Sequence, residues 1–254
     1  MVRNAEDRAD PPAPMADKNA AAVRGMFSAI APRYDLLNHL LSLNTDRRWR
    51  RRAVDRLLAA GRPDGTYLDA CAGTLDLARE IATRNSFRGR VLASDFALPM
   101  LARGVAKVDA LPVSIACADT LRLPVARESL DGVIVGFGVR NLADLDGGLA
   151  EFARVLRPGA PLVILEFTTP SREPFRSLYL FYFRHLLPRV GRLVSRHGSA
   201  YDYLPATVID FPVPKELASR MGAAGFDNVE WDVLTGGIAA VHVGIRRGAQ
   251  STAT

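Results

Sequence analysis

The stretch TYLDACAGTLDLAREIATRNSFRGRVLASD, residues 66–95, decides the fold class of this chain of 254 residues. Residues 66–71 form a short, mostly apolar run that suits a buried parallel strand, and the small residues that follow turn the chain. Residues 75–82 then carry the apolar pattern of a helix, and residues 90–95 predict the next strand, which ends on Asp95. In an open α/β sheet, ligands bind at the carboxyl ends of such strands, so we expect a binding site beside this turn.

The acidic residues around the turn indicate which ligand fits. Asp95 lies about twenty residues past the turn, where a carboxylate can bind the hydroxyl pair of a ribose. A nucleotide with phosphates needs several glycines or a lysine at the turn, whereas this turn has Gly73 followed by Thr74. Asp69 and Asp76 would repel a phosphate, but they suit the cationic sulfonium and amino group of S-adenosylmethionine. On the turn alone, this interpretation and an ordinary strand-to-helix turn with a solvated Asp95 both remain open.

The rest of the chain repeats the alternation of strands and helices. Residues 113–119 predict a third strand, which ends on Asp119 and is followed by Thr120. In methyltransferase folds this position meets the adenine, so Asp119 is expected to accept a hydrogen bond from its exocyclic amine. A fourth apolar run, a helix with an Arg-Pro-Gly stop signal and a fifth strand follow at residues 130–137, 145–156 and 161–167. This spacing predicts a doubly wound parallel sheet.

Several short motifs along the chain occur together in one known family. The central motifs are DTLRLP (119–124), GFGVRN (136–141), RVLRPG (154–159) and LEF (165–167). Further motifs stand towards both ends: MFSAIAPRYDLLN (26–38), YDYL (201–204), FP (211–212) and TGGIAAVH (235–242). Together these residues resemble the UbiE/MenG ubiquinone and menaquinone C-methyltransferases over about residues 23–246. The RVLRPG motif is shared by many methyltransferases, whereas FGVRN combined with the terminal motifs is far more specific.

The resemblance implies an α/β fold, that of a class I S-adenosylmethionine-dependent methyltransferase. Its sheet would be Rossmann-like, doubly wound and seven-stranded, mostly parallel with an antiparallel last strand. The implied reaction is C-methylation of a prenylated demethylquinol with S-adenosylmethionine as cofactor, and the preferred substrate is demethylmenaquinol. The benzoquinol of the ubiquinone pathway and another small molecule are alternatives, as are a non-catalytic protein of this fold and an RNA-binding protein. The expected cofactor-binding residues are Asp69, Gly73, Thr74, Asp76, Asp95, Asp119, Thr120 and Gly136.

Three positions depart from the family pattern. Leu75 replaces a glycine of the family's G-T-G-D turn, and its side chain either narrows the floor under the methionine moiety or turns into the sheet. Gly136 stands where a serine is common, and Ala160 replaces the second glycine after the R-V-L-x-P piece. None of these changes removes a charge from the site, so the implied activity is expected to stand.

Arg140 and Asn141, just beyond the fourth predicted strand, are the leading catalytic candidates. A quinol ring carbon becomes nucleophilic when an adjacent hydroxyl loses its proton, so the site needs a proton acceptor and a group that stabilises the oxyanion. Because arginine stays protonated, Arg140 is expected to stabilise the oxyanion or to lower the pKa of a bound water. A salt bridge to a neighbouring acid such as Asp144 is the structural alternative. Further candidates, each also able simply to hold a lid, are Tyr34, Asp35, Tyr201 and His242.

Composition limits the remaining classes of protein. A hydrophobic content of 48% suits one α/β core, and two cysteines at predicted strand ends suit a reducing compartment without disulfides. The four histidines are scattered, so no metal site is expected. Neither an apolar run of about eighteen residues nor a signal peptide is visible, which predicts a cytoplasmic protein or one peripheral at the inner face of the cell membrane.

One methyltransferase domain is expected over residues 18–247. Within it we expect an N-terminal helical cap at about residues 18–60 and a substrate lid inserted at about residues 170–210. Residues 1–17 are expected to be a disordered tail and residues 248–254 a flexible one.

Two unusual segments suggest partners. The net charge is +6, and an arginine run surrounds Trp49 at residues 47–52. This run is interpreted as a site for anionic lipid or as the solvated side of a helix at residues 46–60; both rank above nucleic acid because no RNA-binding module accompanies it. Residues 175–194 are rich in aromatic residues and arginines, which predicts a pocket for a prenylated ring or a membrane contact, with lid packing as the simpler alternative. The expected partners are therefore a prenylated quinol, a membrane surface and a second copy of the chain in a homodimer, with no nucleic acid.

Overall fold

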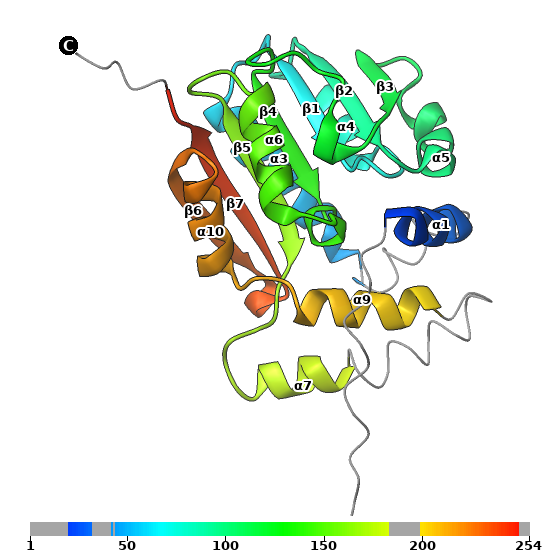
Figure 1. Ribbon diagram of the computed structural model, residues 1–254, viewed down its shortest axis with the longest axis vertical. Helices are drawn as coiled ribbons and strands as arrows, with labels where there is room; N and C mark the ends of the chain where they lie inside the picture. The colour runs from blue at the N-terminus through cyan, green and yellow to red at the C-terminus, as the bar shows by residue number, and fades with distance from the viewer. Residues whose placement is uncertain (1–19, 32–41, 43, 183–198, 249–254) are drawn as a thin grey trace, which may run out of the picture.

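A single mixed sheet runs through the centre of the protein (Figure 1). The computed structural model describes residues 20–31, 42, 44–182 and 199–248. Within these residues, seven strands form the sheet in the order β3-β2-β1-β4-β5-β7-β6. The strands are β1 (Thr66–Ala70), β2 (Arg90–Asp95), β3 (Val113–Cys117), β4 (Gly132–Gly136), β5 (Pro161–Phe167), β6 (Phe226–Leu234) and β7 (Ala239–Arg246). The pairs among β1 to β5 are parallel, and β7 is antiparallel to both of its neighbours, which confirms the predicted sheet.

Helices cover both faces of the sheet and bury its apolar side chains. One core cluster packs the helices α3 (Thr45–Ala60), α4 (Asp76–Ala82) and α5 (Leu98–Val108) on one face. A second cluster packs α6 (Leu145–Val155) and α10 (Pro214–Ala223) on the other face. Both faces of β4 and β5 are therefore buried, which is why these strands are continuous apolar runs in the sequence rather than alternating ones.

The boundaries of α6 follow from local signals in its sequence. Asp144 precedes the helix, and its carboxylate accepts a hydrogen bond from the backbone N–H of Gly147 at 2.9 Å, which satisfies one free donor of the first turn. The helix ends at Val155, before the predicted Arg-Pro-Gly stop. Gly159 then has a φ of +83°, a left-handed conformation that glycine adopts without strain. The chain can therefore turn directly into β5.

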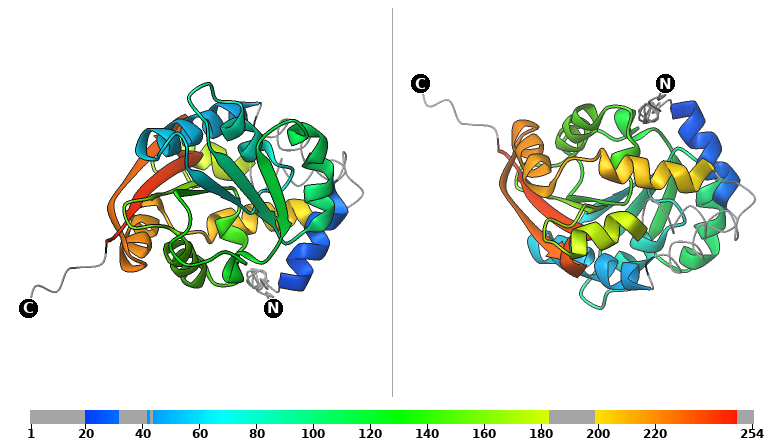
Figure 2. Two further views of the ribbon diagram at one scale, coloured as in Figure 1. Left: turned by 90° about the horizontal axis from the view of Figure 1, so that it is seen from above. Right: turned by 90° about the horizontal axis from the view of Figure 1, so that it is seen from below.

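Three further helices lie beyond the carboxyl ends of the parallel strands: α1 (Ala20–Ile30), α7 (Phe175–Phe181) and α9 (Ser199–Ile209) (Figures 1 and 2). α9 contacts both α1 and the short 3-10 helix η3 (Val139–Asn141), which follows β4. The cap expected at residues 18–60 is thus divided between two places. Its first helix, α1, lies over the strand ends, whereas α3 packs on the face of the sheet because its apolar residues point there.

Part of the expected organisation lies outside the described residues, namely the tails at 1–17 and 249–254 and the middle of the lid at 183–198. Among the helices that are described, none combines the length and the apolar character needed to cross a membrane.

Candidate active site

A cleft opens at the carboxyl ends of the parallel strands, where the sequence predicts a binding site. Its empty space is about 670 Å³ with the solvent at its mouth included. Four strand ends line it, through Cys71 and Gly73 after β1, Asp95 at the end of β2, Asp119 after β3, and Gly136 at the end of β4.

Asp95 connects two turns of the cleft wall. Its Oδ2 accepts a hydrogen bond from the backbone N–H of Gly73 at 2.9 Å, and its Oδ1 accepts one from Ala97 at 2.8 Å. The side chain is only 6% exposed, and burial raises the pKa of its carboxyl while these backbone donors oppose the rise. Each carboxylate oxygen has a second lone pair, so the residue can still accept hydrogen bonds from a ligand in the cleft.

Asp119 and Thr120 form the part of the cleft that follows β3. The Asp119 carboxylate accepts a hydrogen bond from the backbone N–H of Leu121 at 2.9 Å and thereby begins the 3-10 helix η2 (Thr120–Arg122). The hydroxyl of Thr120 lies 3.3 Å from the sulfur of Cys71, across the cleft floor from β1. The structure therefore brings these two predicted residues to the same cleft as Asp95.

The departures at Leu75 and Gly136 have structural explanations. Leu75 has a φ of 67° and is fully buried in the core beneath the sheet face, so its side chain turns into the sheet and does not narrow the cleft. Gly104 of α5 permits this packing, because a Cβ there would come within 2.5 Å of Leu75 Cγ. At Gly136, a Cβ would come within 2.6 Å of Leu77 Cδ1, so a serine would require Leu77 to move.

Asp69 and Thr74, two of the predicted cofactor ligands, lie outside the described lining of the cleft. Asp69 is fully buried in β1, and its Oδ2 accepts a hydrogen bond from the backbone N–H of Ala78 at 2.8 Å, so it caps the first turn of α4. Burial raises the pKa of the Asp69 carboxyl to about 8. Thr74 is 3% exposed and belongs to the turn itself. Both residues are thus suited to shaping the turn rather than to touching a ligand.

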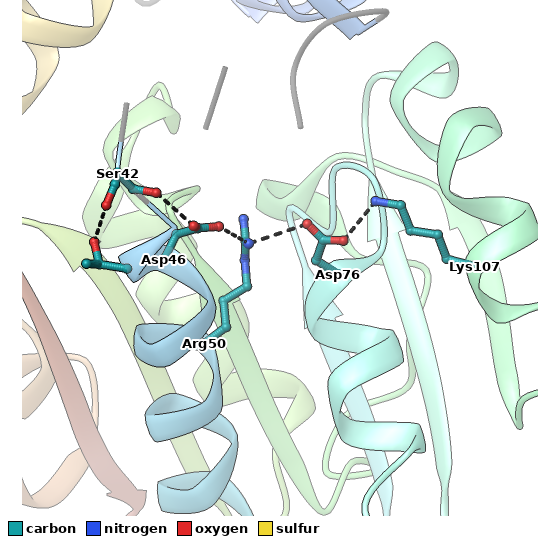
Figure 3. Close-up of polar contacts among 6 residues, drawn as sticks. Ser42, Asp46, Arg50, Asp76 and Lys107 are labelled. Carbon is teal, nitrogen blue, oxygen red and sulfur yellow. Dashed lines mark hydrogen bonds and ion pairs between the residues drawn. The ribbon is translucent and has the colours of Figure 1, made fainter. Parts of the chain in front are cut away.

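Asp76 also lies outside that lining and belongs to a chain of charged groups that joins three helices (Figure 3). Its carboxylate is 2.8 Å from Nζ of Lys107 on α5 and 3.4 Å from a guanidinium nitrogen of Arg50 on α3. Arg50 in turn pairs with Asp46, which accepts a hydrogen bond from the hydroxyl of Ser42 at 2.7 Å. Because two cations already neutralise Asp76, a direct contact with a cationic ligand is less favourable than the sequence suggests.

Arg140, the leading catalytic candidate, is 6% exposed and held by a buried ion pair. Its Nη1 lies 2.7 Å from Oε1 of Glu166 and donates a second hydrogen bond to the carbonyl of Phe137 at 2.6 Å. Its guanidinium also stacks over the ring of Phe167, 5.4 Å from the ring centre. The partner acid is therefore Glu166 and not Asp144, whose carboxylate caps α6 instead.

Glu166 is a residue that reasoning from the sequence missed. It is 2% exposed, and its Oε1 also accepts the backbone N–H of Phe167 at 2.8 Å. Burial raises the pKa of its carboxyl, and the charge of Arg140 opposes that rise. The available signal was the presence of one carboxylate in a strand that is otherwise apolar, since such a group needs a partner.

The other catalytic candidates are distributed differently. Asn141 lines the cleft, and its side-chain amide donates to the carbonyl of Phe137 at 3.3 Å. His242 lies in the middle of β7, where its Nε2 is 3.0 Å from the carbonyl of Pro214, and it is outside the described lining of the cleft. Tyr34 and Asp35 lie outside the described residues, as does the side chain of Tyr201 on α9.

Several arginines of α3, in the run at residues 47–52 and just after it, pair with acids of the same chain. Trp49 is buried and donates from its ring nitrogen to the hydroxyl of Thr235 at 2.9 Å. Arg52 lies 2.9 Å from Asp232 of β6, and Arg56 lies 3.0 Å from Glu230. The run therefore joins a helix to the sheet, which favours the helix interpretation over a surface for nucleic acid.

The sheet order, the antiparallel last strand and the cleft at the strand ends define a class I methyltransferase. Solved structures share this fold. An S-adenosylmethionine-dependent methyltransferase from Thermotoga maritima matches with a TM-score of 0.61 and 16% identity, over 89% of this chain and 100% of that one. The complex between the Haloferax volcanii Trm112 methyltransferase activator and a methyltransferase matches with a TM-score of 0.64 and 18% identity, over 87% of this chain and 98% of that one.

Sequence comparison then identifies the family. Residues 15–246 match the ubiE/COQ5 methyltransferase family, and the chain belongs to it. A demethylmenaquinone methyltransferase from Thermus thermophilus is 48% identical over 87% of this chain and 100% of its own length. One from Deinococcus radiodurans is 45% identical over 92% and 97%. The ubiquinone/menaquinone biosynthesis C-methyltransferase UbiE of Geotalea daltonii is 42% identical over 87% and 95%. The predicted family and enzyme class are confirmed.

Proposed function

We propose that this enzyme transfers a methyl group from S-adenosylmethionine to a ring carbon of a prenylated demethylquinol, and that its substrate is demethylmenaquinol. The observation that carries the proposal is the match along nearly the whole length of demethylmenaquinone methyltransferases at 48% and 45% identity. Relatives named for both quinones are 41% to 44% identical, only slightly less similar. This small difference favours a naphthoquinol over the benzoquinol of the ubiquinone pathway.

The residues of the cleft fit the proposed cofactor. Asp95 has free lone pairs for the ribose hydroxyls, and Asp119 and Thr120 are suited to the adenine end. Gly73 and Gly136 contribute no side chain to the lining, so a ligand can approach the backbone there. We assign Asp69, Thr74 and Asp76 to the second layer, where they hold the turn and α4 in place.

The chemistry requires a nucleophilic carbon aligned with an electrophilic methyl group. S-adenosylmethionine, when bound, supplies that methyl group on its sulfonium. Arg140, fixed by Glu166 and the carbonyl of Phe137, is suited to stabilising the oxyanion that develops on the quinol when its hydroxyl loses a proton. Asn141 is adjacent and lines the cleft, so it is suited to orienting the ring beside the cofactor.

The exposed apolar side chains of α7 support a peripheral contact with the membrane that would supply such a substrate. Leu178 is 64% exposed and Phe181 is 55% exposed, while Arg176, at 50% side-chain exposure, lies on the same helix. Large apolar groups beside a cation are typical of segments that rest at a lipid interface.

The cofactor assignment is tested by Asp95→Ala. A carboxylate that binds both ribose hydroxyls contributes about 1.5–3 kcal/mol for each charge-assisted hydrogen bond, so affinity for S-adenosylmethionine should fall well over tenfold. Calorimetric titration measures this, with Asp109→Ala as the control for loss of an exposed acid of the same type. A folded Asp95→Ala protein that binds S-adenosylmethionine as tightly as the wild type would remove Asp95 from the site.

A further inference from the structure

The hydroxyl of Tyr203 is a buried polar group without a visible purpose in the fold. Tyr203 lies on α9, and its hydroxyl oxygen is buried yet has no hydrogen-bond partner among the described residues. A buried tyrosine hydroxyl normally finds a partner, because an unsatisfied polar group costs about 1–3 kcal/mol. A hydroxyl kept at this cost is suited to a ligand that the protein binds.

Its surroundings connect Tyr203 to the ion pair of Arg140 and Glu166. α9 packs against η3, the short helix that carries Arg140. Burial raises the pKa of the Tyr203 phenol. The positive charge of Arg140 lowers this pKa, and the negative charge of Glu166 raises it. The phenol therefore stays protonated at neutral pH and is available as a donor close to the guanidinium.

Two more polar atoms, both on η3, which α9 contacts, lack partners among the described residues. Arg140 uses its Nη1 for Glu166 and Phe137, whereas its Nε is buried without a hydrogen bond. Oδ1 of Asn141 is likewise buried and unpaired. Donors and an acceptor thus remain unsatisfied along η3 and the facing helix α9.

Aromatic side chains connect this region to the cleft. The rings of Phe137 and Phe167 lie 4.5 Å apart between their centres, and Phe137 and Asn141 line the cleft. Tyr179 of α7 packs with Phe167. Aromatic side chains together with a few polar atoms suit the recognition of an aromatic ring that carries oxygen substituents.

We propose that Tyr203 is a substrate-binding residue, whose hydroxyl donates a hydrogen bond to an oxygen of the quinol ring while Arg140 faces that ring from η3. This assignment rests on the proposed function and deepens it. It gives α9 a direct part in recognising the ring, in addition to covering the strand ends. Glu166 acts here as a positioning residue, because it fixes Arg140 without needing to touch the ring.

The test is Tyr203→Phe, which removes the hydroxyl and keeps the ring. Steady-state rates are measured with a short-chain demethylmenaquinol, beside S-adenosylmethionine titrations and melting curves. We expect kcat/KM for the quinol to fall about tenfold, as for one lost hydrogen bond of about 1.4 kcal/mol. Affinity for S-adenosylmethionine should stay within twofold, and the melting temperature should not fall, because an unsatisfied buried hydroxyl is removed. Tyr182→Phe is the control for loss of a partly buried phenol elsewhere in the described segment: Tyr182 packs against Tyr179, and burial raises the pKa of its phenol too.

The outcomes separate this inference from the proposed function. If the wild-type enzyme methylates the quinol and Tyr203→Phe has the same kcat/KM as Tyr182→Phe, the role of Tyr203 is overturned and the proposed function still stands. A wild-type enzyme that binds S-adenosylmethionine but methylates no prenylated quinol would overturn the proposed function, and the inference with it. A loss confined to the melting temperature would show that the hydroxyl serves only the fold.

Discussion

Arg140 and Glu166 place two charges where the protein is nearly dry. Arg140 is 6% exposed and Glu166 is 2% exposed, so burying their charges carries a desolvation cost. Their close geometry and the hydrogen bonds to the backbone at Phe137 and Phe167 offset that cost. Such fixing is also what catalysis requires, since a donor held in place needs no reorganisation as negative charge develops. The same contacts are thus compatible with a catalytic and with a structural role.

Paired substitutions separate these two roles. Arg140→Met leaves the Glu166 carboxylate buried without its partner, so the variant should lose about 3–5 kcal/mol of stability. Adding Glu166→Gln removes the orphaned charge and should restore most of that loss. Turnover should remain a hundredfold or more below wild type in both variants, because loss of one preorganised donor costs about 2.7–4 kcal/mol.

Steady-state rates on the quinol, read beside melting curves, measure both effects. Arg140→Lys serves as the control that keeps the charge and loses the planar fork, and it should recover part of the rate. If the double variant regained turnover together with stability, Arg140 would be a structural residue only.

Asp69 should make stability depend on pH in an unusual direction. Its pKa is raised by burial to about 8 in the folded protein, against about 3.9 in an unfolded chain. Between these values the folded state binds a proton that the unfolded state lacks, so the contribution of Asp69 is complete below pH about 4 and is lost as pH rises towards 8. Asp69→Asn carries no titrating group and can still accept the N–H of Ala78. Over pH 5 to pH 8 the lost contribution is on the order of 4 kcal/mol. Relative to wild type, the melting temperature of Asp69→Asn without cofactor should therefore rise by roughly ten degrees over this range, at about 2–4 °C per kcal/mol. A difference in melting temperature that stays constant with pH would contradict the raised pKa.

At the scale of the elements, local sequence signals predicted most of the sheet but not all of it. β4, β5 and α6 follow from apolar runs, a capping acid and a Pro-Gly stop, all of which act over neighbouring residues. β6 could not be placed this way, because it is an edge strand whose register shift between Asp227 and Glu230 breaks the regular alternation that would mark a strand. Its presence, and that of antiparallel β7, was implied by the family resemblance.

In the candidate site, too, the sequence predicts the residues at strand ends but not the contacts between distant segments. Asp95, Asp119 and Gly73 stand at strand ends, so their meeting follows from the parallel order of the sheet. The pairing of Arg140 with Glu166 spans two strands and depends on how β5 lies beside β4, which spacing alone does not determine. Asp76 stays a predicted cofactor residue. Its ion pairs with Arg50 and Lys107 could not be predicted, because these partners lie on other helices.

α7 is the element on which the proposed membrane contact depends. Wild-type protein should float weakly with anionic vesicles at low salt, because each nearby cation contributes about 1 kcal/mol and each large apolar side chain about 1.5–3 kcal/mol. Leu178→Ser with Phe181→Ser should lower binding about tenfold or more, whereas Val233→Ser, an exposed apolar residue of β6, should not. Absence of wild-type binding at low salt would leave α7 as part of the lid alone.

At the scale of the whole molecule, several arginines of α3 are engaged in ion pairs between elements of the fold. Arg52 and Arg56 of α3 pair with acids of β6, and Arg50 belongs to the charged chain between α3, α4 and α5 (Figure 3). Exposed pairs of this kind contribute little to stability individually, so their main effect is to orient the helix on the sheet. α1, α7 and α9 lie together at the end of the molecule where the carboxyl ends of the parallel strands stand (Figure 2). The cleft lies at the same end.

The most direct test of the account is methyl transfer by the purified protein itself. Enzyme, S-adenosylmethionine with a labelled methyl group and chemically reduced demethylmenaquinone are incubated together, and the quinone fraction is analysed by mass spectrometry. A demethylated benzoquinol of equal prenyl length is run in parallel. We predict labelled menaquinone, with the methyl group on a ring carbon, at a higher rate than any labelled benzoquinone. Protein that binds S-adenosylmethionine yet transfers label to neither ring would contradict the proposed function.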